Sequence, residues 1–200
     1  MERLELSQDL ARNILHQAKS KGASQGDVVM VESDSFFVTV RLGEIEKISQ
    51  AQEKRLGIRL FFGSSSATAS TSDISKGSIE RLIDDTCAMA RSTAQDKYSG
   101  LPAPEELART FPDLDLFDDS GRSLSVEERT RLALDAEKTA LGFDSRIVNS
   151  EGAEFSNQMG RVIYANSHDF SGEYQGSNYS LSVVPVAALE FPPQRRCRKL

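Results

Sequence analysis

The chain has 200 residues, 24 of them Lys or Arg and 30 Asp or Glu, and 38% are hydrophobic. No stretch approaches the roughly 18 to 20 consecutive apolar residues of a membrane-spanning helix, and the polar first residues lack a secretory signal, so we expect a cytoplasmic protein without membrane attachment. Four of the bases lie in 191–200, which leaves the first 190 residues with 20 bases against 30 acids, a charge of −10. Such an acidic body argues against nucleic-acid binding as the main activity.

Cysteine usage agrees with a reducing compartment. The chain contains Cys87 and Cys197, which are too few for a disulfide framework, and neither belongs to a C-x-x-C pair.

The first predicted element is an amphipathic helix over 7–21, because Leu6, Leu10 and Ile14 recur every four residues before Gly22. Strand-like runs follow. Residues 28–31 are apolar and 36–41 alternate, with turn-forming residues between them, so we predict a hairpin that reverses at 32–35.

Another reversal is expected at 42–44. It precedes a polar edge strand over 45–53 and a strand over 56–62 with one apolar face, and the small residues 67–71 are a candidate further strand. At least four strands are therefore expected.

A second helix is predicted from Ser75 as N-cap to about Ser92. Helix, antiparallel strands and helix within 1–98 indicate a two-layer α+β domain whose helices bury one face of the sheet.

Residues 99–124 are rich in proline and acids and are predicted to be a linker. Ser125 and Glu128 then form a capping box, which starts a third helix that runs to Gly142. Strand-like segments with glycine turns at 152, 160, 172 and 176 follow, so we predict a second domain over 125–190, a helix and then a β-rich part. Residues 191–200 are a basic, divergent tail.

No residue of the sequence can be assigned a catalytic or metal-binding role. The two histidines, His16 and His168, are 152 positions apart and are interpreted as solvated polar residues, so no zinc motif exists. Cys87 lies on the apolar stripe of its helix and is interpreted as a buried, inert thiol.

Three other motifs fail on spacing. The acidic run 113–121 lacks the glycine and the final Glu that a calcium loop needs in either register. The loop 63–66 lacks the second glycine and the Lys of a phosphate-binding loop, and no G-x-S-x-G elbow is present. The basic tail is interpreted as a chain end rather than a binding patch.

Several longer segments nevertheless resemble the TldD/PmbA family, also called modulators of DNA gyrase. The opening segments are Val40–Glu46 and Glu53–Arg59. The PmbA branch, or TldE subunit, is indicated by Leu101–Pro104, Phe111–Asp118, Val148–Ser156, Asn166-Ser167 and Gly172. The similarity runs from about residue 25 to about 186.

This resemblance implies a subunit of a heterodimeric cytoplasmic zinc metalloprotease that degrades unfolded peptides and trims the leaders of peptide antibiotics such as microcin. The zinc is expected in the TldD-type partner, and no family metal ligand maps onto this chain. The PmbA-type subunit is expected to contribute to assembly and to the substrate channel.

From Ala187 on, the sequence departs from the family, whose members continue into a third domain. This departure suggests a truncated product. Alternatives to the subunit role are an inactive remnant, a self-sufficient hydrolase, or a gyrase-modulating interaction protein, the last disfavoured by the −10 charge.

Overall fold

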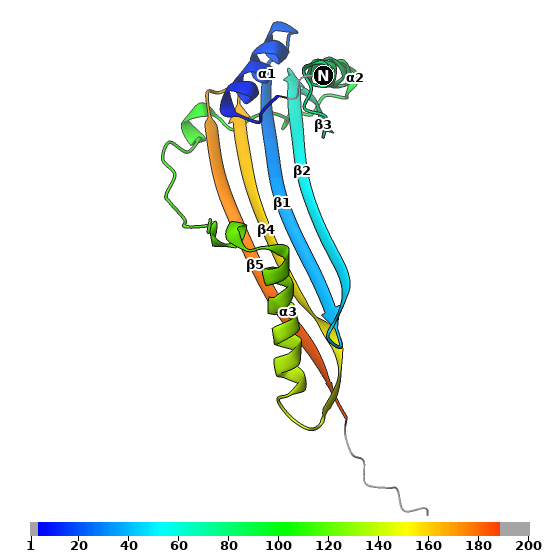
Figure 1. Ribbon diagram of the computed structural model, residues 1–200. Helices are drawn as coiled ribbons and strands as arrows, with labels where there is room; N and C mark the ends of the chain where they lie inside the picture. Colours follow the sequence, from blue (N-terminus) through cyan, green and yellow to red (C-terminus); the bar gives the residue numbers. More distant parts are fainter. Residues whose placement is uncertain (1–3, 189–200) are drawn as a thin grey trace, which may run out of the picture. The chain divides into compact units, whose positions relative to one another are not determined.

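The computed structural model describes residues 4–188, and in this part of the chain five strands form one sheet in the order β3-β2-β1-β4-β5 (Figure 1). The α-helices are α1 (Gln8–Ser20), α2 (Lys76–Ser92) and α3 (Val126–Leu141). The strands are β1 (Gln25–Arg41), β2 (Glu44–Phe62), β3 (Ser65–Thr71), β4 (Ile147–Asn166) and β5 (Ser171–Ala187). The predicted α+β class is confirmed.

Neighbouring strands run antiparallel. In the β2–β3 pair, Leu56 lies opposite Thr71 and Phe62 opposite Ser65. Strands β1 and β2 are joined by the two-residue turn Leu42-Gly43, which confirms the reversal predicted there. Strands β4 and β5 are likewise consecutive and joined by a short turn after Asn166.

The chain divides into two compact units, each built from non-contiguous segments. The first unit comprises 1–34, 51–118 and 158–177, and the second comprises 35–50, 119–157 and 178–200. Strands β1, β2, β4 and β5 therefore contribute residues to both units. The domain boundaries predicted at residues 98 and 124 stay predictions.

In the first unit, α1 and α2 pack their apolar stripes on the sheet. Helix α1 begins where predicted, because the Ser7 Oγ accepts a hydrogen bond from the Leu10 N–H at 3.1 Å. The core combines helix and strand side chains: Ala11, Ile14, Ile79, Ile83 and Cys87 with Val28, Met30, Leu56, Ile58 and Leu60. Each of these side chains is almost fully removed from water, so this layer supplies most of the unit's hydrophobic stabilisation.

In the second unit, α3 covers a smaller core. The predicted capping box is present: the Ser125 Oγ accepts from the Glu128 N–H at 3.1 Å, and the Ser125 N–H donates to the Glu128 carboxylate at 2.7 Å. The buried core residues are Phe36, Val38, Val40, Ala133, Ala153 and Phe155. The small Ala133 lets the helix approach the sheet closely.

The hairpin predicted across 28–41 is wrong, because β1 continues without a break through Glu32-Ser33-Asp34-Ser35. These polar residues are paired across the sheet: the Glu32 carboxylate lies 2.6 Å from the Lys54 Nζ, and the Gln52 Nε2 donates to the Asp34 carboxylate at 3.0 Å. Cross-strand pairing therefore overrides the local turn preference. The segments 45–53 and 56–62 are likewise one strand, β2.

The glycine turns predicted in the β-rich part are also wrong. Gly152 and Gly160 lie inside β4, and Gly172 and Gly176 lie inside β5. Gly152 has a φ of +121°, and a Cβ on it would lie 2.9 Å from the Val40 carbonyl oxygen. This glycine therefore allows an irregular strand backbone to approach its neighbour rather than forming a turn.

Candidate functional site

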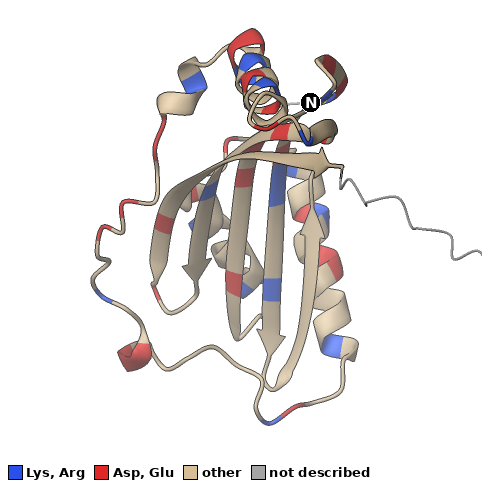
Figure 2. Ribbon diagram, turned by 90° about the horizontal axis from the view of Figure 1, so that it is seen from below, with Lys and Arg blue, Asp and Glu red and all other residues tan. Residues whose placement is uncertain are grey.

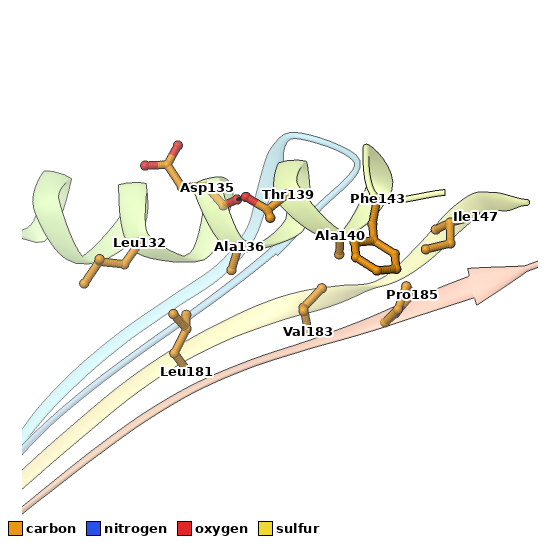
Figure 3. A pocket seen from close by; sticks show the side chains of 10 residues that line it. All are labelled: Leu132, Asp135, Ala136, Thr139, Ala140, Phe143, Ile147, Leu181, Val183 and Pro185. Atoms are coloured by element: carbon orange, nitrogen blue, oxygen red, sulfur yellow. Dashed lines mark hydrogen bonds between the residues drawn. The ribbon is translucent and has the colours of Figure 1, made fainter. Parts of the chain in front are cut away.

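The main concavity that we describe is an apolar groove in the second unit, between α3 and β5 (Figure 3). Its volume is about 540 Å³. It is lined by Leu132, Asp135, Ala136, Thr139, Ala140, Phe143, Ile147, Leu181, Val183 and Pro185. A volume of this size accommodates several apolar side chains.

Helical and strand periodicity together build the groove. Leu132, Ala136 and Ala140 are spaced by four residues and share one flank of α3. Leu181 and Val183 alternate along β5 and point toward that flank (Figure 3). The hollow exists because alanine side chains face larger strand residues.

The large apolar side chains around the groove are unusually exposed. Phe143, just after the end of α3, keeps 82% of its surface accessible, Leu181 50% and Leu132 39%. Contiguous exposed apolar surface marks interaction sites more often than isolated exposed residues do.

The groove is almost uncharged. Asp135 is its one ionisable lining residue, and Thr139 adds a hydroxyl. The rest of the lining is apolar, so the groove is suited to contact with apolar side chains.

A buried carboxylate fixes α3 on the sheet. Glu137 is 1% exposed and accepts hydrogen bonds from the backbone N–H groups of Leu42 at 3.0 Å and Gly43 at 2.9 Å. Burial by itself raises the pKa of Glu137, but bonds from Gly43, Ser150 and Leu42 and the nearby Arg41 charge outweigh it, and the pKa is lowered. The residue therefore holds a charge against the β1–β2 turn.

The histidines and the cysteine that sequence analysis weighed all lie in the first unit. His16 is exposed on α1, as predicted. His168 lies in the β4–β5 turn, with its Nδ1 3.0 Å from the Pro102 carbonyl oxygen. Cys87 is buried in the α2 core, as predicted, and burial raises the pKa of its thiol.

The two rejected loops have structural roles. In the acidic run, the Asp113 Oδ1 accepts from the Asp115 N–H at 3.0 Å, and the Asp118 N–H donates to the Ser177 Oγ at 2.8 Å. Gly63 and the residue after it form the tight turn between β2 and β3, and a strand follows rather than a helix. The basic tail lies outside the described residues.

Across residues 4–188, no group of three or more His, Cys, Asp or Glu side chains is placed to hold a metal ion. The donor set in this part of the chain therefore does not fit zinc. Over the same residues, no helix combines the length and the hydrophobicity that crossing a bilayer requires. Both signs of charge occur on every α-helix and on strands β1, β2 and β4 (Figure 2).

Sequence analysis did not identify the groove. The buried positions of α3 are Thr130, Ala133 and Glu137, whereas Leu132 lies on another side of the helix. Leu132, together with Phe143 just after the helix, is a signal in the sequence, because a solvent-facing surface does not need large apolar residues.

The arrangement of α1, α2 and α3 with a five-stranded antiparallel sheet is shared with solved proteins. A candidate modulator of DNA gyrase from Bacteroides thetaiotaomicron superposes with a TM-score of 0.83 at 24% identity, over 92% of this chain and 41% of that one. TldE from Thermococcus kodakarensis superposes with a TM-score of 0.73 at 16% identity, over 90% and 39%. The fold is thus that of this class of proteins.

Family models and relatives give the same assignment. Residues 26–90 match the PmbA/TldA metallopeptidase domain 1, and residues 119–195 match the PmbA/TldA metallopeptidase central domain. The second match extends beyond Ala187, where the resemblance was predicted to end. The chain belongs to the PmbA/TldD family.

Two curated relatives carry the PmbA name. A metalloprotease PmbA homolog of Haemophilus influenzae is 34% identical over 171 residues, which is 86% of this chain and 38% of the relative. Metalloprotease PmbA of Escherichia coli O157:H7 is 33% identical over 183 residues, 88% of this chain and 40% of the relative. The chain thus spans about 40% of the length of these relatives.

Proposed function

We propose that this chain supplies a PmbA/TldE-type, non-catalytic part of a two-subunit zinc metalloprotease. In this proposal a TldD-type subunit carries the zinc and cleaves the peptide bond. The observation that carries the proposal is the match, in order, to the first and central domains of this metallopeptidase family, together with 33–34% identity to proteins named metalloprotease PmbA.

The donor set supports placing the metal in the partner. His16, His168 and Cys87 belong to separate elements, and no metal-holding group occurs among residues 4–188. Zinc sites need three or four such ligands around one point. In the proposed complex this chain therefore contributes assembly and peptide contacts, and the chemistry resides in the TldD-type subunit.

The proposed substrates are unfolded peptides, including leader segments of microcin-like peptide antibiotics, and the proposed compartment is the cytoplasm. The apolar groove beside α3 supports a peptide substrate, because unfolded chains expose the apolar side chains that such a groove can bury.

Co-purification tests the proposal directly. A tagged form of this chain is mixed with a TldD-type subunit of the same organism, and the complex is assayed on reduced, carboxymethylated casein with and without a zinc chelator. We expect a stable pair that cleaves the casein only when zinc is present. A chain that neither binds the TldD-type subunit nor changes its activity would overturn the proposal.

Direct action on DNA is the weaker alternative. The first 190 residues carry a net charge of −10, and acids and bases are interspersed on each α-helix. DNA binding requires a basic face whose affinity falls steeply with salt. A gel shift that weakens with rising salt would favour this alternative over the peptidase role.

A further inference from the structure

We propose that the edge of β5 beside the groove binds an extended peptide as an added strand, with alternate apolar side chains of the peptide inserted against α3. The inference rests on the proposed function, because it takes an unfolded peptide as the ligand and assigns it a place on this chain.

The first support is the direction of the backbone groups of β5. Within the described residues, β5 is the last strand of the sheet. The Ala188 N–H donates to the Arg146 carbonyl oxygen at 2.8 Å, on the β4 side, and the Phe170 carbonyl accepts from the Asn166 N–H at 2.9 Å on the same side. Even-numbered residues therefore point their backbone groups toward β4.

Odd-numbered residues accordingly point their N–H and C=O groups away from β4, because these directions alternate along a strand. Ser177 follows this rule: its N–H donates outward, to the Leu116 carbonyl oxygen at 2.9 Å. The segment around Leu116 thus occupies the outward-facing N–H of β5 at this one residue.

Past this point the edge is open along Leu181 and Val183, for which the residues 4–188 provide no covering strand. Pro185 occupies the next outward-facing position, where its missing N–H breaks no bond to β4. An incoming strand can therefore pair with Leu181 and Val183 and must end its pairing at Pro185. At about 3.3 Å per residue this edge fits a peptide segment of roughly six residues.

The second support is the match between edge and groove. The side chains of Leu181, Val183 and Pro185 line the groove and point toward α3 (Figure 3). A strand added at this edge would direct alternate side chains the same way, beside Leu132 and Phe143. Backbone groups at the edge supply affinity, and the groove supplies the preference for apolar residues at alternate positions.

Charge refines the occupant. Asp135 is the one ionisable residue of the groove and is exposed. Its carboxylate points away from β5 (Figure 3), so the surface that the inserted side chains would meet is apolar. A charged side chain inserted there would lose its hydration without gaining a partner. The occupant is thus an extended peptide with uncharged, apolar residues at alternate positions.

The binding test uses a fluorescein-labelled peptide of alternating valine and threonine, and fluorescence anisotropy of the full chain. Two further peptides carry N-methyl groups on alternate backbone amides: one is methylated at every valine and the other at every threonine. The valine–threonine alternation fixes which face meets the groove, so one methylated peptide should lose at least about tenfold in affinity and the other less than about threefold. Equal binding of both methylated peptides, or no binding of the unmethylated one, would overturn the inference.

A matched pair of variants locates the site. Leu181→Asp places a charge in the groove and should weaken binding at least about tenfold, whereas Ser182→Asp places the same charge on the opposite face of β5 and should change it less than about twofold. Hydrogen exchange adds a readout at the edge: bound peptide should slow exchange of the Leu181 and Val183 amides. Unchanged exchange at both amides would contradict the assignment.

Two outcomes separate this inference from the proposed function. A pair with the TldD-type subunit that cleaves casein, combined with no peptide binding by this chain, would overturn only the inference. Peptide binding by a chain that does not assemble with the TldD-type subunit would overturn only the proposed function. Self-association that Leu181→Asp abolishes, seen by sedimentation without peptide, would assign the edge to a second copy and overturn the peptide assignment.

Discussion

Replacing the buried carboxylate of α3 tests how the second unit is held together. Glu137→Gln keeps the shape of the side chain but leaves one oxygen for the two N–H groups of Leu42 and Gly43, and it turns an NH₂ group toward a donor. Bonds to a charged acceptor contribute about 1.5–3 kcal/mol each, and a buried unmet donor costs about 1–3 kcal/mol. We therefore expect the variant to lose about 2–4 kcal/mol of unfolding free energy, or roughly 5–15 °C in Tm.

The pH dependence follows from the lowered pKa of Glu137. A carboxylate whose pKa is lower in the folded state stabilises the fold above the unfolded-state pKa of about 4.3, and this contribution is lost as the pH falls through the folded-state pKa. The difference between wild type and Glu137→Gln should therefore be constant from about pH 7 to about pH 5 and should shrink below about pH 4.

Urea unfolding followed by circular dichroism measures both effects. Asp135→Asn is the matched control, because it makes the same change of charge on the exposed side of the same helix, and it should shift the unfolding free energy by less than about 0.5 kcal/mol. A Glu137→Gln variant as stable as wild type at pH 7, or a difference that is the same at pH 3 and pH 7, would refute the reasoning.

Three further predictions concern packing. Gly121→Ala should cost several kcal/mol in urea unfolding, since a Cβ there would lie 2.2 Å from the Tyr179 ring, whereas Gly77→Ala in open space on α2 should gain about 0.5–1 kcal/mol. Ile83→Ala should lose about 2–5 kcal/mol by the same measurement, because Ile83 is fully buried. In a Cys197→Ser variant, the Cys87 thiol should resist a thiol reagent until the chain unfolds, and rapid labelling of this folded variant would contradict the burial of Cys87.

The helices were accessible to sequence reasoning because their signals are local. Ser7 caps α1, and Ser125 and Glu128 cap α3, within a few residues of the apolar stripe that each helix buries. Such patterns need no knowledge of distant partners. All three α-helices lie within a few residues of their predicted bounds.

The strands were predicted too short because their continuity depends on distant residues. Glu32 and Asp34 have turn-forming chemistry, but Lys54 and Gln52 on β2 pair with them. A local signal did exist: the apolar residues Val28 and Met30 before the polar stretch and Phe36, Val38 and Val40 after it all fall at even-numbered positions. A four-residue turn has no need to preserve that phase. Strands of five or six residues are more common than longer ones. Sequence reasoning therefore tends to divide a long strand into several short ones.

The position of Glu137 in the sequence indicates that it fixes α3 to another part of the second unit. It falls at a core position of α3 where an apolar residue is expected, and a carboxylate there requires donors from elsewhere in the fold. The Leu42-Gly43 turn provides them, because both residues adopt positive φ, 50° and 80°, and both amides meet the carboxylate. A charged residue on an apolar stripe, together with a tight turn rich in free amides, therefore indicates a helix anchored on a hairpin tip.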